Sequence, residues 1–273
     1  MAFGAIAADT AAATNALSVA DMPLLVQVED ACINASAPPQ QRWLDGWLLR
    51  AQPGKARRAR CIHALAPGRL PLATRLARAA EHYRDAGLPL IFRITPFTHP
   101  PGLDADLAAL GFAHADNTHV LIYRTLKSPQ QHPLPQGLGW TTLSATALAE
   151  AVGELRHSPP AHRQAHAQRL LQSPVLHRAC AIQRVADGRV LCCGQFAVDG
   201  PLVGLYDVFT HPDARGQGLA SQLCERLLHD AATRGAKTAY LQVDAGNDAA
   251  LRVYRRLGFE PGYDYHYRES PLS

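Results

Sequence analysis

One short loop combines residues whose types and spacing could hold a phosphate group. The segment Arg215-Gly216-Gln217-Gly218 follows an apolar run over 202–210 and leads into leucines spaced four apart, at 219, 223 and 227. This pattern predicts a buried strand, a turn and a helix. The first N–H groups of a helix lack internal partners and carry partial positive charge, and glycines leave them open to an anion. With an arginine beside it, the loop is a candidate anion site.

The familiar nucleotide-binding loops do not account for this segment. No Lys-Ser or Lys-Thr pair follows the glycines, which excludes a Walker loop, and the three-glycine dinucleotide pattern is incomplete. An Arg-Gly turn in a surface loop that binds no ligand remains an alternative interpretation of the same residues.

The elements after the loop position a second group of candidate residues. The helix from 219 ends at Arg234-Gly235, and a short strand is predicted over 238–243. Residues 244–248 form a turn that can cap the next helix. That helix carries Tyr254 on its apolar face and stops at Gly258, after which the last strand begins at Phe259.

With these elements in this order, the chain resembles the GCN5-related N-acetyltransferase family over residues 138–269. Three pieces carry the resemblance: Arg215-x-x-Gly218-x-Ala220, the turn at Asn247, and Ala250-x-x-x-Tyr254-x-x-x-Gly258-Phe259. The resemblance implies an α/β fold and an enzyme that uses acetyl-coenzyme A as co-substrate, without a metal. It also implies that a primary amine attacks the thioester directly in a ternary complex. A non-catalytic acyl-coenzyme A-binding sensor or adaptor remains the alternative.

The resemblance also implies roles for individual residues. The glycine loop would bind the pyrophosphate of acetyl-coenzyme A, and the preceding strand would pair its backbone with the pantetheine arm. Backbone N–H groups near Val208 would stabilise the tetrahedral oxyanion. The expected cofactor-binding residues are Val208, Thr210, Arg215, Gly216, Gln217, Gly218, Leu219, Ala220, Ser221 and Asn247.

Two residues are candidates for proton transfer. The resemblance makes Tyr254 the general acid for the leaving thiolate, although its apolar helix face also fits a role in the core. Asp207 is the carboxylate in an otherwise apolar strand, where desolvation would raise its pKa and suit it to act as general base. A structural hydrogen bond is the alternative role for Asp207.

The chain repeats itself on either side of a proline-rich linker at 128–137. Gly111-Phe112 and His119 match Gly258-Phe259 and His266 at an offset of 147 residues (258 − 111; 266 − 119). We therefore predict two tandem modules, each a mixed, mostly antiparallel twisted sheet flanked by helices. The predicted parts are a disordered N-terminus at 1–22, a degenerate module at 23–127, the linker, and a catalytic module at 138–273.

The first copy differs from the second where chemistry is expected. Pro71 stands at the place of Gly218, and Leu107 at the place of Tyr254. Proline has no N–H to offer a phosphate, and leucine cannot donate a proton. We therefore expect a single cofactor site per chain and a first module that completes a substrate cleft.

Two further clusters allow more than one interpretation. The basic run from Lys55 to Arg60 could contact nucleic acid, form a solvated edge, or meet an anionic substrate group at the junction of the modules. The histidines at 157, 162 and 166 lie close together. Because Ser158-Pro159-Pro160 interrupts them and no cysteine joins them, we predict no metal site. The resemblance implies that this region shapes the acceptor pocket, so a substrate role is the alternative.

Composition sets the class of protein. The chain of 273 residues is 47% apolar, enough for two cores, and contains no apolar run that would span a bilayer. The first twenty residues carry no Lys or Arg, unlike a signal peptide. Six cysteines without a CxxC pair predict buried, reduced thiols in a cytoplasmic protein. The net charge of +4 is too mild to indicate nucleic acid. The resemblance makes a small-molecule or peptide amine the expected partner.

Overall fold

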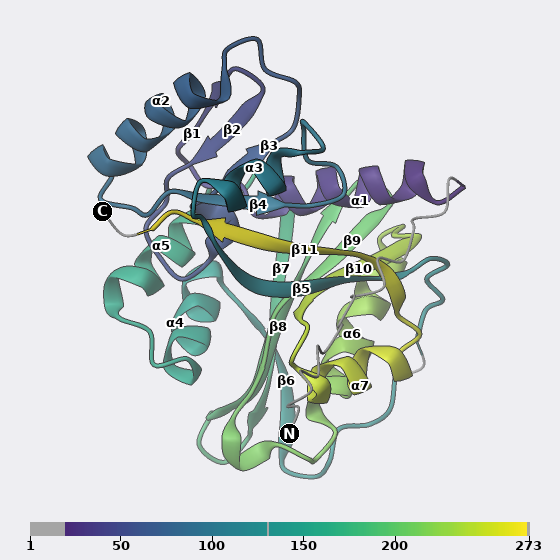
Figure 1. Cartoon of the computed structure of the whole chain (residues 1–273). Helices are drawn as coiled ribbons and strands as arrows, with labels where there is room; N and C mark the ends of the chain where they lie inside the picture. Colours follow the sequence, from purple (N-terminus) through teal and green to yellow (C-terminus); the bar gives the residue numbers. More distant parts are fainter. Residues whose placement is uncertain (1–19, 130, 272–273) are drawn as a thin grey trace, which may run out of the picture.

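The computed structural model describes residues 20–129 and 131–271, so the N-terminal segment predicted to be disordered lies almost entirely outside the described residues. Within these residues, eleven strands form one sheet with helices on both faces (Figure 1). The strands are β1 Gln41–Leu44, β2 Trp47–Arg50, β3 Ile62–Ala64, β4 Ile91–Ile94, β5 Ala113–Tyr123, β6 Leu138–Leu143, β7 Leu176–Arg184, β8 Val190–Asp199, β9 Leu202–Thr210, β10 Thr238–Asp244 and β11 Glu260–Glu269. The helices are α1 Met22–Ala35, α2 Leu72–Asp85, α3 Leu103–Ala109, α4 Ala145–Leu155, α5 Pro160–Leu171, α6 Leu219–Thr233 and α7 Asp248–Arg256, with short 3₁₀ turns η1 Arg57–Ala59 and η2 Pro212–Ala214.

The predicted α/β class is confirmed. The sheet is mostly antiparallel, and the parallel pairs of the described strands are β3 with β4 and β9 with β10. The strand expected at 202–210 spans those same residues, and the helix that follows it begins at Leu219. Strand β10, helix α7 and strand β11 follow in the expected order.

The two halves do not form separate sheets, and this differs from the prediction. The strand order is β1-β2-β3-β4-β11-β5-β10-β9-β8-β7-β6. Strand β5 of the first half pairs with β10, and β11 of the second half pairs with β4. The last strand of each half is therefore hydrogen-bonded to the body of the other. Hydrophobic periodicity could not show this exchange, because it predicts a strand but not the strand's neighbour.

The repeat nevertheless has a structural counterpart. Helices α2 and α6 begin 147 residues apart (219 − 72), as do strands β4 and β10 (238 − 91). In each half, the two strands of the parallel pair stand on either side of the helix in the sequence. Strands β3 and β4 flank α2, and strands β9 and β10 flank α6. The division into modules at the predicted boundaries stays a prediction.

Alternate residues of the central strands face different helices. On β7, Ala181 packs with α4 and α5 while Ile182 packs with α6, and on β8 the neighbours Cys193 and Cys192 divide in the same way. This is the period of two expected of a strand buried on both faces. Figure 1 shows α4 and α5 on one side of these strands and α6 and α7 on the other.

Helix α1 joins the two halves. Its apolar residues share a core with Leu202 and Tyr240 of the second half. Glu29 of α1 forms a buried ion pair with Arg93 of β4, and Tyr263 of β11 donates a hydrogen bond to the same carboxylate at 2.5 Å. Partners on two strands, β4 and β11, satisfy this charged group, as a buried carboxylate requires.

The cysteines behave as the sequence predicts. All six are buried, and none forms a disulfide within the described part of the chain. None of the described helices is both long and apolar enough to cross a membrane.

Candidate active site

The glycine loop places a row of free N–H groups at the start of α6. Gly216 and Gly218 have φ of +76° and +75°, a conformation that glycine adopts without a Cβ penalty. No acceptor among the described residues takes a hydrogen bond from the backbone N–H groups of residues 216–220. A Cβ atom at either glycine would meet nothing within 4 Å, so both glycines border open space.

Local sequence explains the approach to this loop. Pro212 begins the turn η2, and the Asp213 N–H donates to His211 Nδ1 at 3.2 Å. Buried Leu219 anchors the first turn of α6, whereas Arg215 is exposed. The loop is thus fixed at both ends while its donors and its arginine face solvent, which suits a phosphate group.

Strands β9 and β10 separate as they approach this loop. Their parallel pairing runs from Leu202 with Thr238 to Leu205 with Leu241 and then stops. Beyond that point β9 continues to Thr210 beside β8, and β10 continues to Asp244 beside β5. The end of β9, which includes the predicted residues Val208 and Thr210, therefore has a strand on one side only. Its other edge is available to a ligand.

A β-bulge lies at the point of separation. Asp207 has a φ of +51°, and the register between β8 and β9 shifts between the pairs Gln195–Tyr206 and Cys193–Phe209. A Cβ at Gly194, opposite the bulge, would stand 3.2 Å from Val208 Cγ2, so glycine permits this close approach. Bulges redirect side chains and often occur beside active sites.

Tyr254 lies beneath the loop, on α7. It is 9% exposed, stacks edge-on against Phe259 at 6.0 Å, and belongs to the core that contains Leu219. Its hydroxyl has no hydrogen-bond partner within the part of the chain that the structure describes. Burial, together with the neighbouring Cys224 and Cys192 thiols, raises the pKa of Tyr254 above its ordinary range. Like any tyrosine, it is protonated at neutral pH and carries a proton that it can donate.

Asn247 has a structural task as well as its predicted one. Its Oδ1 accepts a hydrogen bond from the Ala250 N–H at 3.1 Å and so caps α7. This oxygen is committed to the helix, while the side chain is exposed beside the turn. The side-chain atom of Asn247 that remains free to contact a cofactor is its amide nitrogen.

The expectation of a raised pKa for Asp207 is wrong. Burial alone would raise the pKa of this carboxyl, but His166, Arg169 and Arg156 act against burial and lower it. Asp207 Oδ2 accepts hydrogen bonds from Gln195 at 2.6 Å and from His166 at 3.1 Å. A carboxylate stabilised in this way is a weak proton acceptor.

His166 was not identified as a proton-transfer residue from the sequence. It lies on α5, 41 residues before Asp207, so only the packing of α5 on the sheet brings the two together. The helical spacing of His162 and His166 was the available signal. With Nε2 hydrogen-bonded to a carboxylate, Nδ1 of the neutral ring is left as a proton acceptor, an arrangement common among catalytic histidines.

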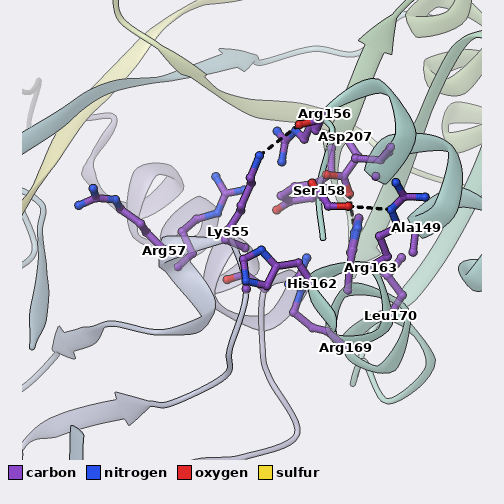
Figure 2. Close-up of a pocket in the computed structure, with 18 of the residues that line it drawn as sticks. Lys55, Arg57, Ala149, Arg156, Ser158, His162, Arg163, Arg169, Leu170 and Asp207 are labelled. Carbon is purple, nitrogen blue, oxygen red and sulfur yellow. Dashed lines mark hydrogen bonds and ion pairs between the residues drawn. The ribbon is translucent and has the colours of Figure 1, made fainter. Parts of the chain in front are cut away.

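A cavity of about 260 Å³ opens at this histidine–aspartate pair. Its walls come from both halves: the 53–58 segment and β5 from the first, and α4, α5, β9 and β10 from the second. Figure 2 shows Lys55 reaching toward Arg156, whose carbonyl oxygen accepts a hydrogen bond from Lys55 Nζ at 3.2 Å. Three residues of the basic run, Lys55, Arg57 and Arg58, line this cavity, and Lys55 is exposed at the same time.

The histidines at 157, 162 and 166 do not assemble a metal site. No group of three or more His, Cys, Asp or Glu side chains that could hold a metal ion occurs among residues 20–129 and 131–271. His162 and His166 both line the cavity instead.

The equivalent loop of the first half is closed by its own side chain. Asp45 accepts hydrogen bonds from the backbone N–H groups of Arg69, at 2.9 and 3.0 Å, and of Leu70, at 2.8 Å. These hydrogen bonds lower the pKa of Asp45. An internal carboxylate thus occupies the donors that precede α2, and Pro71 stands at the helix N-cap.

Comparison with known proteins places the site in a known context. The family model described as the acetyltransferase (GNAT) family matches residues 148–259, which include the loop, the strand separation and the tyrosine. An uncharacterized N-acetyltransferase, YobR, from Bacillus subtilis is 25% identical over 231 residues, covering 84% of this chain and 91% of that protein. The [ribosomal protein bS18]-alanine N-acetyltransferase of Escherichia coli is 40% identical over 55 residues, 20% of this chain and 37% of that protein.

Solved structures share the fold over more of the chain. A GCN5-related N-acetyltransferase from Kribbella flavida superposes with a TM-score of 0.62 at 18% identity and covers 94% of this chain and 98% of its own. A tandem GNAT protein from the clavulanic acid biosynthesis pathway superposes with a TM-score of 0.58 at 17% identity, covering 74% and 70%. At these identities the similarity shows the fold.

Proposed function

Since the chain belongs to the acetyltransferase (GNAT) family and is an N-acetyltransferase of that kind, we propose that it transfers an acetyl group from acetyl-coenzyme A to a primary amine at one centre in its second half. The observation that carries the proposal is the separation of β9 from β10 just before the free N–H groups of residues 216–220. The open edge of β9 suits an extended amide-containing arm, and the N–H row suits a pyrophosphate.

The loop and β9 would bind and orient the co-substrate. Arg215 and the N–H groups of residues 216–220 hold the pyrophosphate, with Ser221 and Thr210 beside them. Backbone groups of β9 near Val208, exposed by the bulge, would hydrogen-bond the thioester carbonyl. Fixed N–H donors at that position stabilise the charge that develops on the oxygen during attack, which is commonly the largest catalytic contribution.

Two groups would move protons. Tyr254 is protonated at neutral pH, as a tyrosine with an ordinary pKa of about 10 would be, and its hydroxyl can therefore protonate the departing thiolate. His166 would accept the proton of the acceptor ammonium at Nδ1, while Asp207 holds the ring through the hydrogen bond at Nε2. Asp207 therefore supports the base rather than acting as the base. The amine attacks directly once both substrates are bound.

The first half would complete the acceptor cavity without a second centre. Its 53–58 segment forms one wall of the cavity, and its own loop is occupied by Asp45. The acceptors named for relatives, such as the alanine of ribosomal protein bS18, belong to those proteins. For this chain the proposed acceptor is an amine of a small molecule or a peptide.

A thiol-release assay tests the proposal. The protein is mixed with acetyl-coenzyme A and a panel of primary amines, and free thiol and N-acetylated amine are measured together. We expect the two products in equal amounts for the accepted amines, with a lower rate in His166→Gln. Thiol release without acetylated amine, or no binding of acetyl-coenzyme A at all, would contradict the proposal.

A further inference from the structure

The cavity at Asp207 holds more positive charge than its own carboxylates neutralise. Six Lys or Arg side chains line it. Arg57 is paired with Asp116 at 2.9 Å and Glu269 at 2.7 Å, and Arg163 with Glu150 at 3.0 Å. The other four have no carboxylate within ion-pair distance in the described part of the chain. These four are Lys55, Arg58, Arg156 and Arg169.

Three of these unpaired cations are arginines that come from different elements and influence one another. Arg58 lies at η1, Arg156 at the end of α4, and Arg169 in the last turn of α5. Burial lowers the pKa of Arg156 and of Arg169, and Asp207 partly offsets this while Arg58 adds to it. Three guanidinium groups held together destabilise one another unless an anion joins them.

Most of their hydrogen-bonding capacity is unused; the one described acceptor is the Tyr265 hydroxyl, which takes a hydrogen bond from Arg58 at 3.5 Å. Each guanidinium carries five N–H donors. The Arg156 guanidinium packs over the Phe209 ring, 4.1 Å from its centre, and Arg58 packs over Tyr206 at 5.8 Å. No hydrogen-bond acceptor among the described residues engages the side chain of Arg156 or Arg169. His162 Nδ1, in the same wall, is also buried without a partner.

Asp207 does not balance this charge. Its Oδ2 is already shared between Gln195 and His166, which leaves one oxygen for the neighbouring Arg169 and Arg156. That arrangement fits a ligand with two ends: a cationic amine near Asp207 and an anionic group near the arginines. Forked guanidinium groups bind carboxylate and phosphate oxygens in pairs.

Building on the proposed function, we propose that the acceptor carries an anionic group, a carboxylate or a phosphate, in addition to its amine, and that Arg58, Arg156 and Arg169 bind this group. The site is separate from the proposed pyrophosphate loop, because none of residues 215–220 lines the cavity. A neutral amine of the same size would leave the arginines unpaired and bind more weakly. The first half contributes one of the three arginines, so recognition of the acceptor depends on both halves.

Calorimetric titration of the coenzyme A-saturated protein with inorganic phosphate, and separately with succinate, tests the proposal. Saturation with coenzyme A first fills the glycine loop, so that the probes report the cavity. We expect at least one probe to bind with one site per chain. In Arg169→Gln and Arg156→Gln its affinity should fall roughly ten- to a hundredfold, the value of a hydrogen bond to a charged group. Binding of phosphate alone or of succinate alone identifies the class of anion.

Controls separate this proposal from the proposed function. Arg184→Gln removes an exposed arginine that pairs with Asp187 outside the cavity, and should leave anion binding unchanged. Unchanged coenzyme A affinity in a variant shows that the variant is folded. Arg169→Lys keeps the positive charge and should retain part of the affinity for the anion. Absence of binding by both probes, or equal binding by the glutamine variants, overturns the inference. Absence of coenzyme A binding overturns the proposed function, and the cavity variants titrated with phosphate then decide the inference alone.

Discussion

Removal of the Tyr254 hydroxyl distinguishes a catalytic role of this residue from a packing role. Tyr254→Phe removes one proton donor and little volume, and no described hydrogen bond is lost. We predict a fall in kcat and in kcat/KM of roughly ten- to a thousandfold, the contribution typical of a general acid, with coenzyme A affinity nearly unchanged. Steady-state kinetics with an accepted amine, together with calorimetry, measures both quantities.

Tyr123 provides the matched control for this variant. Like Tyr254, it packs edge-on against Phe259, with ring centres 5.8 Å apart. Tyr123→Phe should keep full turnover. Equal rates for wild type and Tyr254→Phe, with chemistry rate-limiting, would show that Tyr254 serves only the core.

Asp207 should make stability depend on pH in a defined direction. Its folded-state pKa lies below the ordinary value of about 3.9, so the ionised form stabilises the fold above about pH 4, and this contribution is lost as the pH falls through the folded pKa. We predict that Asp207→Asn is less stable than wild type by about 1–3 kcal/mol throughout pH 5–8. Below about pH 4 the difference should shrink.

Urea unfolding of both proteins across this range measures the effect. Asp213→Asn is the control, because Asp213 has a side chain that is 71% exposed, and its change should be small. A stability difference that is absent at pH 7 and present only at acidic pH would contradict the account of Asp207.

The direction of the Asp207 pKa shift could not be predicted from the sequence. An aspartate within an apolar strand predicts burial, and burial by itself raises the pKa of a carboxyl. The opposing groups, His166, Arg169 and Arg156, come from helices 38 to 51 residues earlier in the chain (207 − 169; 207 − 156). Their proximity to Asp207 follows from the packing of the helices against the sheet. The sequence therefore identified Asp207 as a buried site residue but not the direction of its pKa shift.

At the scale of elements, the loop before α6 makes the sharpest prediction. Gly218→Asn keeps a residue that tolerates a left-handed conformation and places a side chain in the open space before the free N–H groups. We predict that coenzyme A affinity falls at least tenfold, about 1.4 kcal/mol or more, while the protein remains folded. Gly235→Asn is the matched control at the other end of α6, because Gly235 has a φ of +99° and the same open space.

Equal coenzyme A affinity in the two variants would remove the loop from the cofactor site. The loop itself could be predicted, because a strand, two glycines and a helix are consecutive in the chain. The bulge at Asp207 and the separation of β9 from β10 could not, since both are properties of pairing between strands. The backbone donors could therefore be located from the sequence, whereas the shape of the cleft depends on strand pairing that the sequence does not show.

At the scale of the whole molecule, the exchange of β5 and β11 makes the halves interdependent. Strand β10, which forms one side of the cleft, has β5 of the first half as its outer neighbour. The cavity likewise takes walls from both halves. The repeat in the sequence predicted two similar units, but a constant offset carries no information about which half a strand joins.

Equilibrium titration of the intact protein with acetyl-coenzyme A tests the central claim most directly, since it requires no knowledge of the acceptor. The second half offers free N–H donors at residues 216–220, whereas Asp45 occupies the corresponding donors of the first. We predict one bound acetyl-coenzyme A per chain, and an affinity at least tenfold lower, with no second site of wild-type affinity, when the loop is blocked in Gly218→Asn. Two equivalent sites per chain, or saturable binding of the same affinity in Gly218→Asn, would contradict the account.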